Sequence, residues 1–325
     1  MPYGAWAHHD TEVSLPTPTP GAFTVSDEVR AALHDARPIV ALESTIFTHG
    51  LPRPRNLKVA LDAEQVLRDR GVVPATIGVL HGRPVVGLTT DEISELSRSD
   101  EAGKFSLRDL PVAATRGRSG GTTVAATSFL AHRAGIHVFA TGGLGGVHRE
   151  ASTTFDESAD LPVLAQTPIL VVSAGVKSIL DIPASLERME TLSVTVVGYR
   201  TTRFPGFYIS DSGFEIEYAV DDADAAAQLV RARDALGIEG AIIVANPVPA
   251  EAQLERAEHD AVLADALAAA AQHGVVGHDS TPFLLDHVQR ATQGRSLDVN
   301  VAVYRNNVEL GGEIATSLCA GAAAP

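Results

Sequence analysis

Short apolar runs rich in β-branched residues alternate with helical patterns along almost the whole chain of 325 residues. Apolar runs of four to eight residues are typical of buried strands, and their alternation with helices is typical of a mostly parallel sheet. We expect strands at 38–43, 112–114, 136–141, 169–174, 194–199, 216–220 and 241–245, and a hairpin over 75–88. No repeat or linker interrupts the pattern, so the sequence predicts one α/β domain.

Caps, glycine stops and apolar spacing predict the helices between these strands. We expect helices over 26–36, 56–70, 91–101, 124–134, 221–236, 250–273 and 280–294, with two more beginning at 178 and near 297. Pro16, Pro18 and Pro20 occur in a stretch without periodicity. We therefore interpret residues 1–24 as a flexible extension and residues 25–325 as a single domain.

Composition limits the partners that the chain can bind. A formal net charge of −15 argues against a nucleic-acid polymer or an anionic membrane as partner. No run of eighteen apolar residues and no signal-peptide pattern is present. A single cysteine, Cys319, excludes an intrachain disulfide and fits the cytoplasm. These features predict a cytoplasmic protein that acts on a small molecule.

Lysine is rare in this chain, because only Lys58, Lys104 and Lys177 occur among 25 basic residues. A lysine can lose its proton and act as a nucleophile, whereas an arginine cannot. Lys58 falls on the exposed face of an expected helix and needs no special role. Lys177 follows the expected strand 169–174 and precedes an expected helix, whose positive end would help to keep the amine neutral.

The segment 141–161 combines four glycines, one histidine and four carboxylates directly after an expected strand. Glycine N–H groups approach anions closely, and His148 can add positive charge. Asp156, Ser158 and Asp160 form an oxygen-rich cluster of the kind that hard cations prefer. Open α/β sheets bind ligands at the ends of strands, so we interpret this segment as a site for a phosphorylated ligand and a divalent metal.

Two other strand ends carry candidate groups. Glu43 stands where an apolar strand gives way to polar residues, a common place for a catalytic carboxylate. Gly120 to Thr123 precede the expected helix 124–134, and the free N–H groups of such a turn can bind an anion or simply cap the helix. Dinucleotide binding is not favoured, because His148 occupies the place of the third fingerprint glycine. No Gly-Lys-Ser/Thr sequence occurs either, so a P-loop is absent.

These motifs resemble the pseudouridine-5′-phosphate glycosidase family, which includes the protein called indigoidine synthase A. The resemblance runs from about Pro38 to Ala320 through ALESTIFTHGLPRPRN, KFSLRDLPVAATRGRSGGTTVAAT, TGGLGGVHR, TFDESADL, SAGVKSILDIP, FPGFY, ANPVP, TPFLL and NVAVYRNNVELGGEIA. It implies a three-layer α/β/α sandwich with a central mixed, mainly parallel sheet. It also implies a homotrimer with one Mn²⁺ per subunit.

The resemblance implies a role for ten residues of this chain. Lys177 is expected as the nucleophile, Glu43 as the proton donor and Asp156 as the metal-holding residue. Substrate contacts are expected at Lys104, Val124, Thr141, His148, Ser158, Asp160 and Asn300. Lys104 and His148 are expected on the phosphate side, and Asn300 near the uracil.

The activity that the resemblance implies is reversible cleavage of the carbon–carbon glycosidic bond of pseudouridine 5′-phosphate, which gives uracil and ribose 5-phosphate. A carbon leaving group is too poor for the two-carboxylate scheme of ordinary glycosidases. If Glu43 protonates the ring oxygen and Lys177 adds to the anomeric carbon, an imine of the opened sugar allows uracil to leave. Two alternatives stay open: another Schiff-base lyase or aldolase of sugar phosphates, and a non-catalytic sugar-phosphate sensor.

Overall fold

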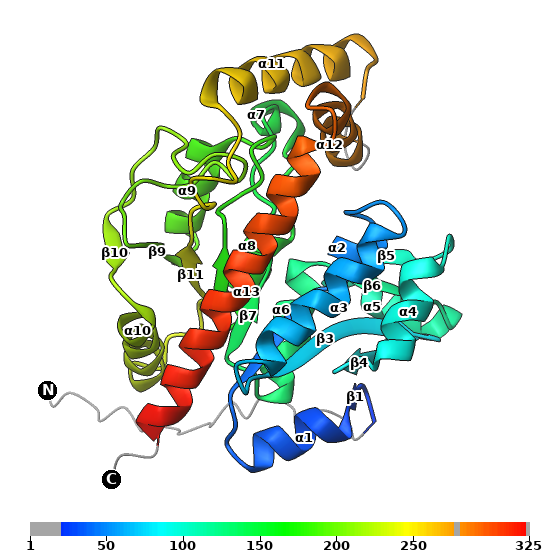
Figure 1. Ribbon diagram of the computed structural model, residues 1–325, viewed down its shortest axis with the longest axis vertical. Helices are drawn as coiled ribbons and strands as arrows, with labels where there is room; N and C mark the ends of the chain where they lie inside the picture. The colour runs from blue at the N-terminus through cyan, green and yellow to red at the C-terminus, as the bar shows by residue number, and fades with distance from the viewer. Residues whose placement is uncertain (1–20, 276–279, 323–325) are drawn as a thin grey trace, which may run out of the picture.

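A computed structural model describes residues 21–275 and 280–322 of the chain. The described residues form one 11-stranded sheet, and helices cover both of its faces (Figure 1). Within this part of the chain, β3 pairs antiparallel with β4 and with β6, and all other pairs are parallel. The expected α/β/α sandwich with a mixed, mainly parallel sheet is confirmed.

The strand order across the sheet is β1-β4-β3-β2-β7-β8-β11-β9-β10, and β6 and β5 continue from β3. The strands are β1 (Thr24–Val25), β2 (Ile39–Leu42), β3 (Val73–Leu80), β4 (Arg83–Val86), β5 (Gly103–Phe105), β6 (Gly120–Thr122), β7 (Val138–Ala140), β8 (Leu170–Ser173), β9 (Thr195–Tyr199), β10 (Tyr218–Val220) and β11 (Ile242–Ala245). All but one of the expected strands are present, with ends that differ by at most two residues.

Successive side chains of each central strand point to opposite faces, and each face is covered by its own helices. Val40 and Leu42 belong to the cluster beneath α3 (Arg55–Arg68), α4 (Thr90–Arg98), α10 (Ala223–Ala235) and α13 (Arg295–Ala322). Ile39 and Ala41 belong to the opposite cluster. Its helices are α1 (Asp27–His34), α5 (Leu110–Arg116), α6 (Val124–Ala134), α8 (Asp160–Leu164) and α9 (Ile182–Thr191), with α11 (Arg256–Gln272) and α12 (Ser280–Ala291). Short helical segments complete the chain: α2 (Thr45–Thr48), α7 (Ala151–Thr154) and the 3₁₀ turn Leu107–Asp109.

The strand order reverses between β2 and β7. From β2 the chain continues to β3 on one side, and from β7 it continues to β8 on the other. In open α/β sheets such a switch point leaves a crevice at the carboxyl ends of the two strands, because the following segments diverge. The residues after Leu42 and Ala140 therefore stand where this fold can bind a ligand.

Helix α13 crosses the middle of the sheet between α3 and α10 (Figure 1). Gly311 permits this close approach, because a Cβ at this position would stand 3.1 Å from Ala140 Cβ and 3.5 Å from Val40 Cγ1. Among the described residues, no helix combines the length and the apolar character that are needed to cross a membrane.

Three local expectations are wrong. Residues 112–114 are not a strand but part of α5, which has Pro111 in its first turn and ends at Gly117 with φ of 60°. The expected turn at Gly120 begins β6 instead, where a Cβ would meet the backbone nitrogen of Gly103 at 2.6 Å. No helix begins at Ser178, because Asp181 caps α9 by accepting the Ala184 N–H at 3.0 Å.

The predicted boundaries also shift at two places. α11 begins at Arg256 rather than at residue 250, because the Leu254 N–H donates to the carbonyl of Tyr208 and diverts the chain. Residues 1–20 of the predicted flexible extension lie outside the described residues. Thr24 pairs with Val85 as part of β1, so the folded region begins before the predicted boundary at residue 25.

We predict that Gly311→Leu lowers the free energy of unfolding by about 1–3 kcal/mol, because the new side chain must push α13 away from β2 and β7. Glu313→Leu, at an exposed position of the same helix, serves as the control. Urea denaturation of both variants measures the difference. Equal stability of Gly311→Leu and the wild type would contradict the close packing described for α13.

Candidate active site

Glu43 and Thr141 meet at the switch point. Glu43 directly follows β2 and is 7% exposed, and Thr141 directly follows β7 and is fully buried. The Thr141 hydroxyl donates a hydrogen bond to Glu43 Oε1, and the hydroxyl of Thr45 donates to Oε2. The predicted proton donor is therefore held at both carboxyl oxygens, in a setting that excludes most solvent.

The glycine-rich segment after β7 pairs with the segment after β8. The Ala174 N–H donates to Gly142 O at 3.0 Å, and the Leu144 N–H donates to Gly175 O at 2.9 Å. The Lys177 N–H in turn donates to Leu144 O at 3.1 Å. Parallel pairing thus continues past the ends of both strands, and it fixes the backbone of Lys177 beside the glycines.

Lys177 does not stand at a helix N-terminus, contrary to the expectation from sequence. It is half-buried in a loop five residues before α9, so the helix dipole does not act on it directly. Its neighbours in the chain are apolar, because Val176 is fully buried and Ile179 is 2% exposed. The chain on both sides of Lys177 is therefore packed in an apolar surrounding.

Asp160 joins the glycine segment to α6. Its Oδ1 accepts the N–H of Ala125 at 2.9 Å in the first turn of α6, and its Oδ2 accepts the N–H of Gly145 at 2.9 Å. A Cβ on Gly145 would stand 2.1 Å from Ser158 Oγ, so only glycine fits there. The negative charge of the Asp160 carboxylate is also favourable at the N-terminal, positive end of α6. Asp160 therefore shapes the site through two backbone donors.

The charges of three predicted site residues act on Lys104. Burial lowers the pKa of Lys104, the positive charge of Lys177 lowers it further, and Asp160 and Glu43 raise it. The Lys104 side chain is exposed, and the protein around its ammonium group still makes desolvation the largest cause. Lys177, Glu43 and Asp160, which come from three other segments, therefore lie near enough to influence the charge of Lys104.

Asn300 and Ser158 lie against the glycine segment. Asn300 Oδ1 stands 3.4 Å from the position that a Cβ on Gly142 would take. Ser158 donates its N–H to Gly146 O at 2.9 Å and packs against Gly145. Val124 is the first residue of α6, next to Ala125, whose N–H donates to Asp160. The roles of these three residues as substrate contacts stay predictions.

His148 and Asp156 form a pair further along the same segment. The His148 N–H donates to Asp156 O at 3.0 Å, and His148 Nδ1 lies 3.7 Å from Asp156 Oδ2. The joint role of His148 and Lys104 at the phosphate stays a prediction.

The predicted oxygen-rich cluster is divided. Ser158 Oγ accepts the Asp160 N–H at 3.2 Å, and both oxygens of the Asp160 carboxylate accept backbone N–H groups. The neighbouring Glu157 pairs with Arg188 at 2.8 Å. Within residues 21–275 and 280–322, no three His, Cys, Asp or Glu side chains gather as a metal site. Asp156 keeps a carboxylate that is 34% exposed, which suits a metal ion that retains most of its waters.

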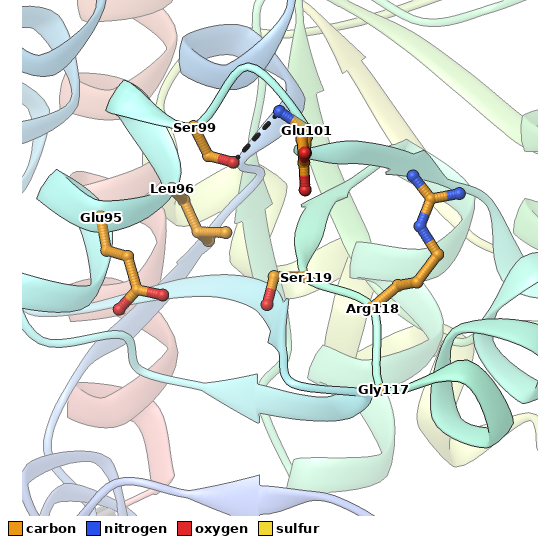
Figure 2. A pocket seen from close by; sticks show the side chains of 7 residues that line it. All are labelled: Glu95, Leu96, Ser99, Glu101, Gly117, Arg118 and Ser119. Carbon is orange, nitrogen blue, oxygen red and sulfur yellow. Dashed lines mark hydrogen bonds between the residues drawn. The ribbon is translucent and has the colours of Figure 1, made fainter.

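A separate cavity of about 610 Å³ opens beyond α4 (Figure 2). Its lining contains one cation, Arg118, together with Glu95 and Glu101. The two carboxylates disfavour an anionic ligand there, and none of the predicted site residues lines it. We therefore place the candidate active site at the switch point rather than in this cavity.

Sequence reasoning missed three groups that touch the site. The hydroxyl of Thr45 donates to Glu43. Only the position of Thr45 two residues after Glu43 could have indicated this contact. The pKa of His49 is lowered by burial and then by the charge of Lys104. Asn307 of α13 donates to the carbonyls of Thr141 and Gly142. A distant partner of this kind leaves no local pattern in a sequence.

The model of a family described as indigoidine synthase A like protein matches residues 28–317. The chain belongs to this family. It is 64% identical over 294 residues to a pseudouridine-5′-phosphate glycosidase from Saccharopolyspora erythraea, covering 90% of this chain and 97% of that relative. It is 55% identical over 294 residues to one from Salinispora tropica, covering 90% and 91% respectively.

Two solved structures of similar proteins have the same fold. A crystal structure of the prealnumycin C-glycosynthase AlnA in complex with ribulose 5-phosphate aligns with a TM-score of 0.86 and 36% identity, covering 93% of this chain and 98% of that one. An indigoidine synthase A-like protein from Thermotoga maritima aligns with a TM-score of 0.83 and 34% identity, covering 91% and 96%.

Proposed function

We propose that this protein reversibly cleaves the carbon–carbon glycosidic bond of pseudouridine 5′-phosphate to give uracil and ribose 5-phosphate. The observation that carries the proposal is the position of Glu43 at the switch point, where Thr45 and Thr141 hold it, with Lys177 fixed beside the glycine segment that follows Thr141. The identity of up to 64% to pseudouridine-5′-phosphate glycosidases supports it. The complex of AlnA with ribulose 5-phosphate supports a sugar phosphate as ligand.

The reaction proceeds through an imine between Lys177 and the opened sugar. The neutral amine of Lys177 attacks the anomeric carbon, and the carbon–oxygen bond of the ring breaks as Glu43 gives its proton to the ring oxygen. The ammonium ion formed at the Lys177 nitrogen then loses a proton, and a proton is added at the uracil ring carbon. The nitrogen lone pair forms the C=N⁺ bond while the electrons of the carbon–carbon bond return to uracil. Water hydrolyses the iminium ion, which frees ribose 5-phosphate and the Lys177 amine.

The two threonines around Glu43 allow it to serve as the acid. A hydroxyl group can both donate and accept a hydrogen bond, so Thr45 or Thr141 can donate to the carboxylate and accept from the carboxylic acid. Glu43 is therefore held in one orientation in both protonation states. A fixed orientation matters because proton transfer requires the acid within hydrogen-bond distance of the ring oxygen.

The substrate phosphate binds at Lys104. Ser106 Oγ and Thr123 Oγ1, which lie just beyond the paired ends of β5 and β6, are buried and have no hydrogen-bond partner among the described residues. Buried hydroxyl groups without partners are rare in proteins, and a polar ligand next to Lys104 would satisfy both. Burial lowers the pKa of Lys104. A bound phosphate dianion would oppose this effect, because a nearby negative charge favours the charged form of the lysine.

Mn²⁺ is the proposed metal, with Asp156 as the protein group that holds it. The half-exposed carboxylate fits a hard cation, and the adjacent His148 and backbone can hold its water ligands. When bound, the ion supplies positive charge near an anionic ligand. The proposed homotrimer and the cytoplasmic location remain predictions that rest on the family resemblance and on composition.

Two alternative functions use the same groups. Another Schiff-base lyase or aldolase of sugar phosphates would use Lys177 but release no uracil. A sugar-phosphate sensor would bind at Lys104 and leave Lys177 without a role. Incubation with pseudouridine 5′-phosphate and manganese, with detection of free uracil, separates the proposal from both.

Borohydride reduction in the presence of ribose 5-phosphate is expected to attach the sugar irreversibly to Lys177, because reduction converts the imine to a stable amine. Lys177→Arg should fold normally and release no uracil. Lys58→Arg, a change at an exposed lysine paired with Asp62, is the matched control and should keep full activity. Mass spectrometry locates the label, and a label on Lys104 or Lys58 would contradict the assignment.

A chelator should lower the activity and manganese should restore it, because Asp156 is the carboxylate left open to a metal. Asp156→Asn is expected to weaken manganese binding by at least about tenfold, since the site loses its one anionic protein ligand. Glu157→Gln is the control, because Glu157 pairs with Arg188. Calorimetric titration with Mn²⁺ measures both variants, and unchanged affinity of Asp156→Asn would exclude this site.

Lys104→Ala should lower kcat/KM for pseudouridine 5′-phosphate by roughly ten- to a hundred-fold, because a charge-assisted contact contributes about 1.5–3 kcal/mol. Part of the loss should appear in kcat, since remote binding energy can hold the reacting carbon near Lys177. The wild type should process unphosphorylated pseudouridine poorly, and Lys104→Ala should leave that rate almost unchanged.

Arg118→Ala supplies the comparison for this experiment, because Arg118 is the cation of the separate cavity (Figure 2). It should behave like the wild type with both substrates. Equal losses with both substrates in Lys104→Ala would place Lys104 at the sugar or base. A selective loss in Arg118→Ala would move the phosphate site to the separate cavity.

A further inference from the structure

We propose that Asn307 is a positioning residue for the reaction. Together with Asn246 it forms a buried hydrogen-bonded link to the backbone of Thr141 and Gly142, which we call the strap. Asn307 lies on α13 and reaches the site through the backbone carbonyls of Thr141 and Gly142, so its effect passes through Thr141 to Glu43. The inference rests on the proposed function, because it names what holds the proton donor of that reaction in place.

The contacts of Asn307 are all made in the interior. Its Nδ2 donates to Thr141 O at 2.7 Å and to Gly142 O at 3.2 Å, and the side chain is fully buried. Its Oδ1 accepts a hydrogen bond from Asn246 Nδ2 at 3.0 Å. The amide therefore uses both of its donors and its acceptor, and these partners allow one orientation of the group.

Asn246 is itself anchored near the catalytic lysine. It directly follows β11, it is 5% exposed, and its N–H donates to Ser173 O at 2.8 Å. Ser173 ends β8, four residues before Lys177. The strap therefore ties α13 to the carboxyl ends of three strands, β7, β8 and β11, on the side of the sheet where Glu43 lies.

The strap acts mainly on Thr141. Gly142 O also accepts the N–H of Ala174 at 3.0 Å, so it keeps a partner when Asn307 is removed. The Thr141 N–H donates to Val172 O at 3.0 Å, and Asn307 holds the carbonyl on the other side of the same residue. With both backbone groups held, the Thr141 hydroxyl is aimed at Glu43 Oε1. Loss of the strap should therefore misalign the acid rather than the phosphate contact.

The test compares two asparagines of the same helix. Asn307→Ala removes the strap, whereas Asn306→Ala removes one hydrogen bond from α13 to Pro247 O (3.1 Å) and leaves Thr141 untouched. Asn307→Ala should lower kcat by about ten- to a hundred-fold and change KM by about twofold or less, since small misplacements of a catalytic group cost that much. Asn306→Ala should stay within about twofold of the wild type in both constants, because its hydrogen bond lies outside the path to Glu43.

A double variant shows whether the effect passes through Thr141. Thr141→Val removes the hydroxyl that reaches Glu43, so Asn307→Ala combined with Thr141→Val should lose no more kcat than the poorer single variant. Multiplied losses would overturn the proposal. An unchanged kcat of Asn307→Ala with a lower melting temperature would also overturn it, because Asn307 would then support only stability.

Hydrogen exchange provides a readout that does not need activity. Amides of 142–147 should exchange faster in Asn307→Ala than in the wild type, and equal exchange would refute the strap. If Asn307→Ala fails to fold, Asn246→Ser takes its place, since it frees the Asn307 amide and should lower kcat in the same direction. A wild type that releases no uracil would refute the proposed function alone, and the exchange result would still decide whether the strap exists.

Discussion

The chemistry of this site depends on the parallel pairing of β2 with β7. Their register sets Leu42 opposite Ala140, so Glu43 and Thr141 emerge side by side where the strand order reverses. A shift by one residue would move every side chain of one strand to the other face. The alternation of Val40 and Leu42 with Ile39 and Ala41 prevents it, because each pair is buried under different helices. Core packing thus determines where the acid stands.

The glycine segment shows how a binding loop can be rigid without a hydrophobic core of its own. Asp160 accepts two backbone N–H groups, one from the segment and one from α6. After β8, Gly175 O accepts the N–H of Leu144, and Ala174 and Lys177 donate their N–H groups to carbonyls of the segment. Charged acceptors of backbone N–H groups make stronger hydrogen bonds than neutral ones. The segment is therefore held by directed polar contacts, which leave its remaining N–H groups and its open side available to a ligand.

Sequence alone was sufficient for the framework of the fold. Runs of β-branched residues gave the central strands, because fully buried parallel strands need continuous apolar sequence. The place of Glu43 and Lys177 after two such runs predicted that they would lie at one edge of the sheet. Two failures have local causes. Residues 112–114 begin with the β-branched Val112, yet Pro111 and Gly117 make them part of a helix. The sequence around Lys177 is typical of a helix start, yet α9 begins only after Asp181, which caps it.

The roles of Asp160 and Asn307 show a deeper limit. Both are polar residues of a type that often binds a ligand. In the structure both form hydrogen bonds with backbone groups of the site. Nothing in a local pattern distinguishes an aspartate that binds substrate from one that binds an N–H group 35 residues away, as Asp160 does with Ala125. The distinction requires knowledge of which segments meet, and that is a property of the fold.

The dependence on α13 has a consequence for how the site assembles. Asn307 reaches a carbonyl 166 residues earlier in the chain, so the glycine segment gains its strap only after the last helix has docked on the sheet. Contacts of such large sequence separation form late, because closing a long loop costs entropy before the contact stabilises the chain. Glu43 and Lys177 both precede α13. The backbone of Thr141, whose hydroxyl holds the proposed acid, therefore gains its last support when α13 docks.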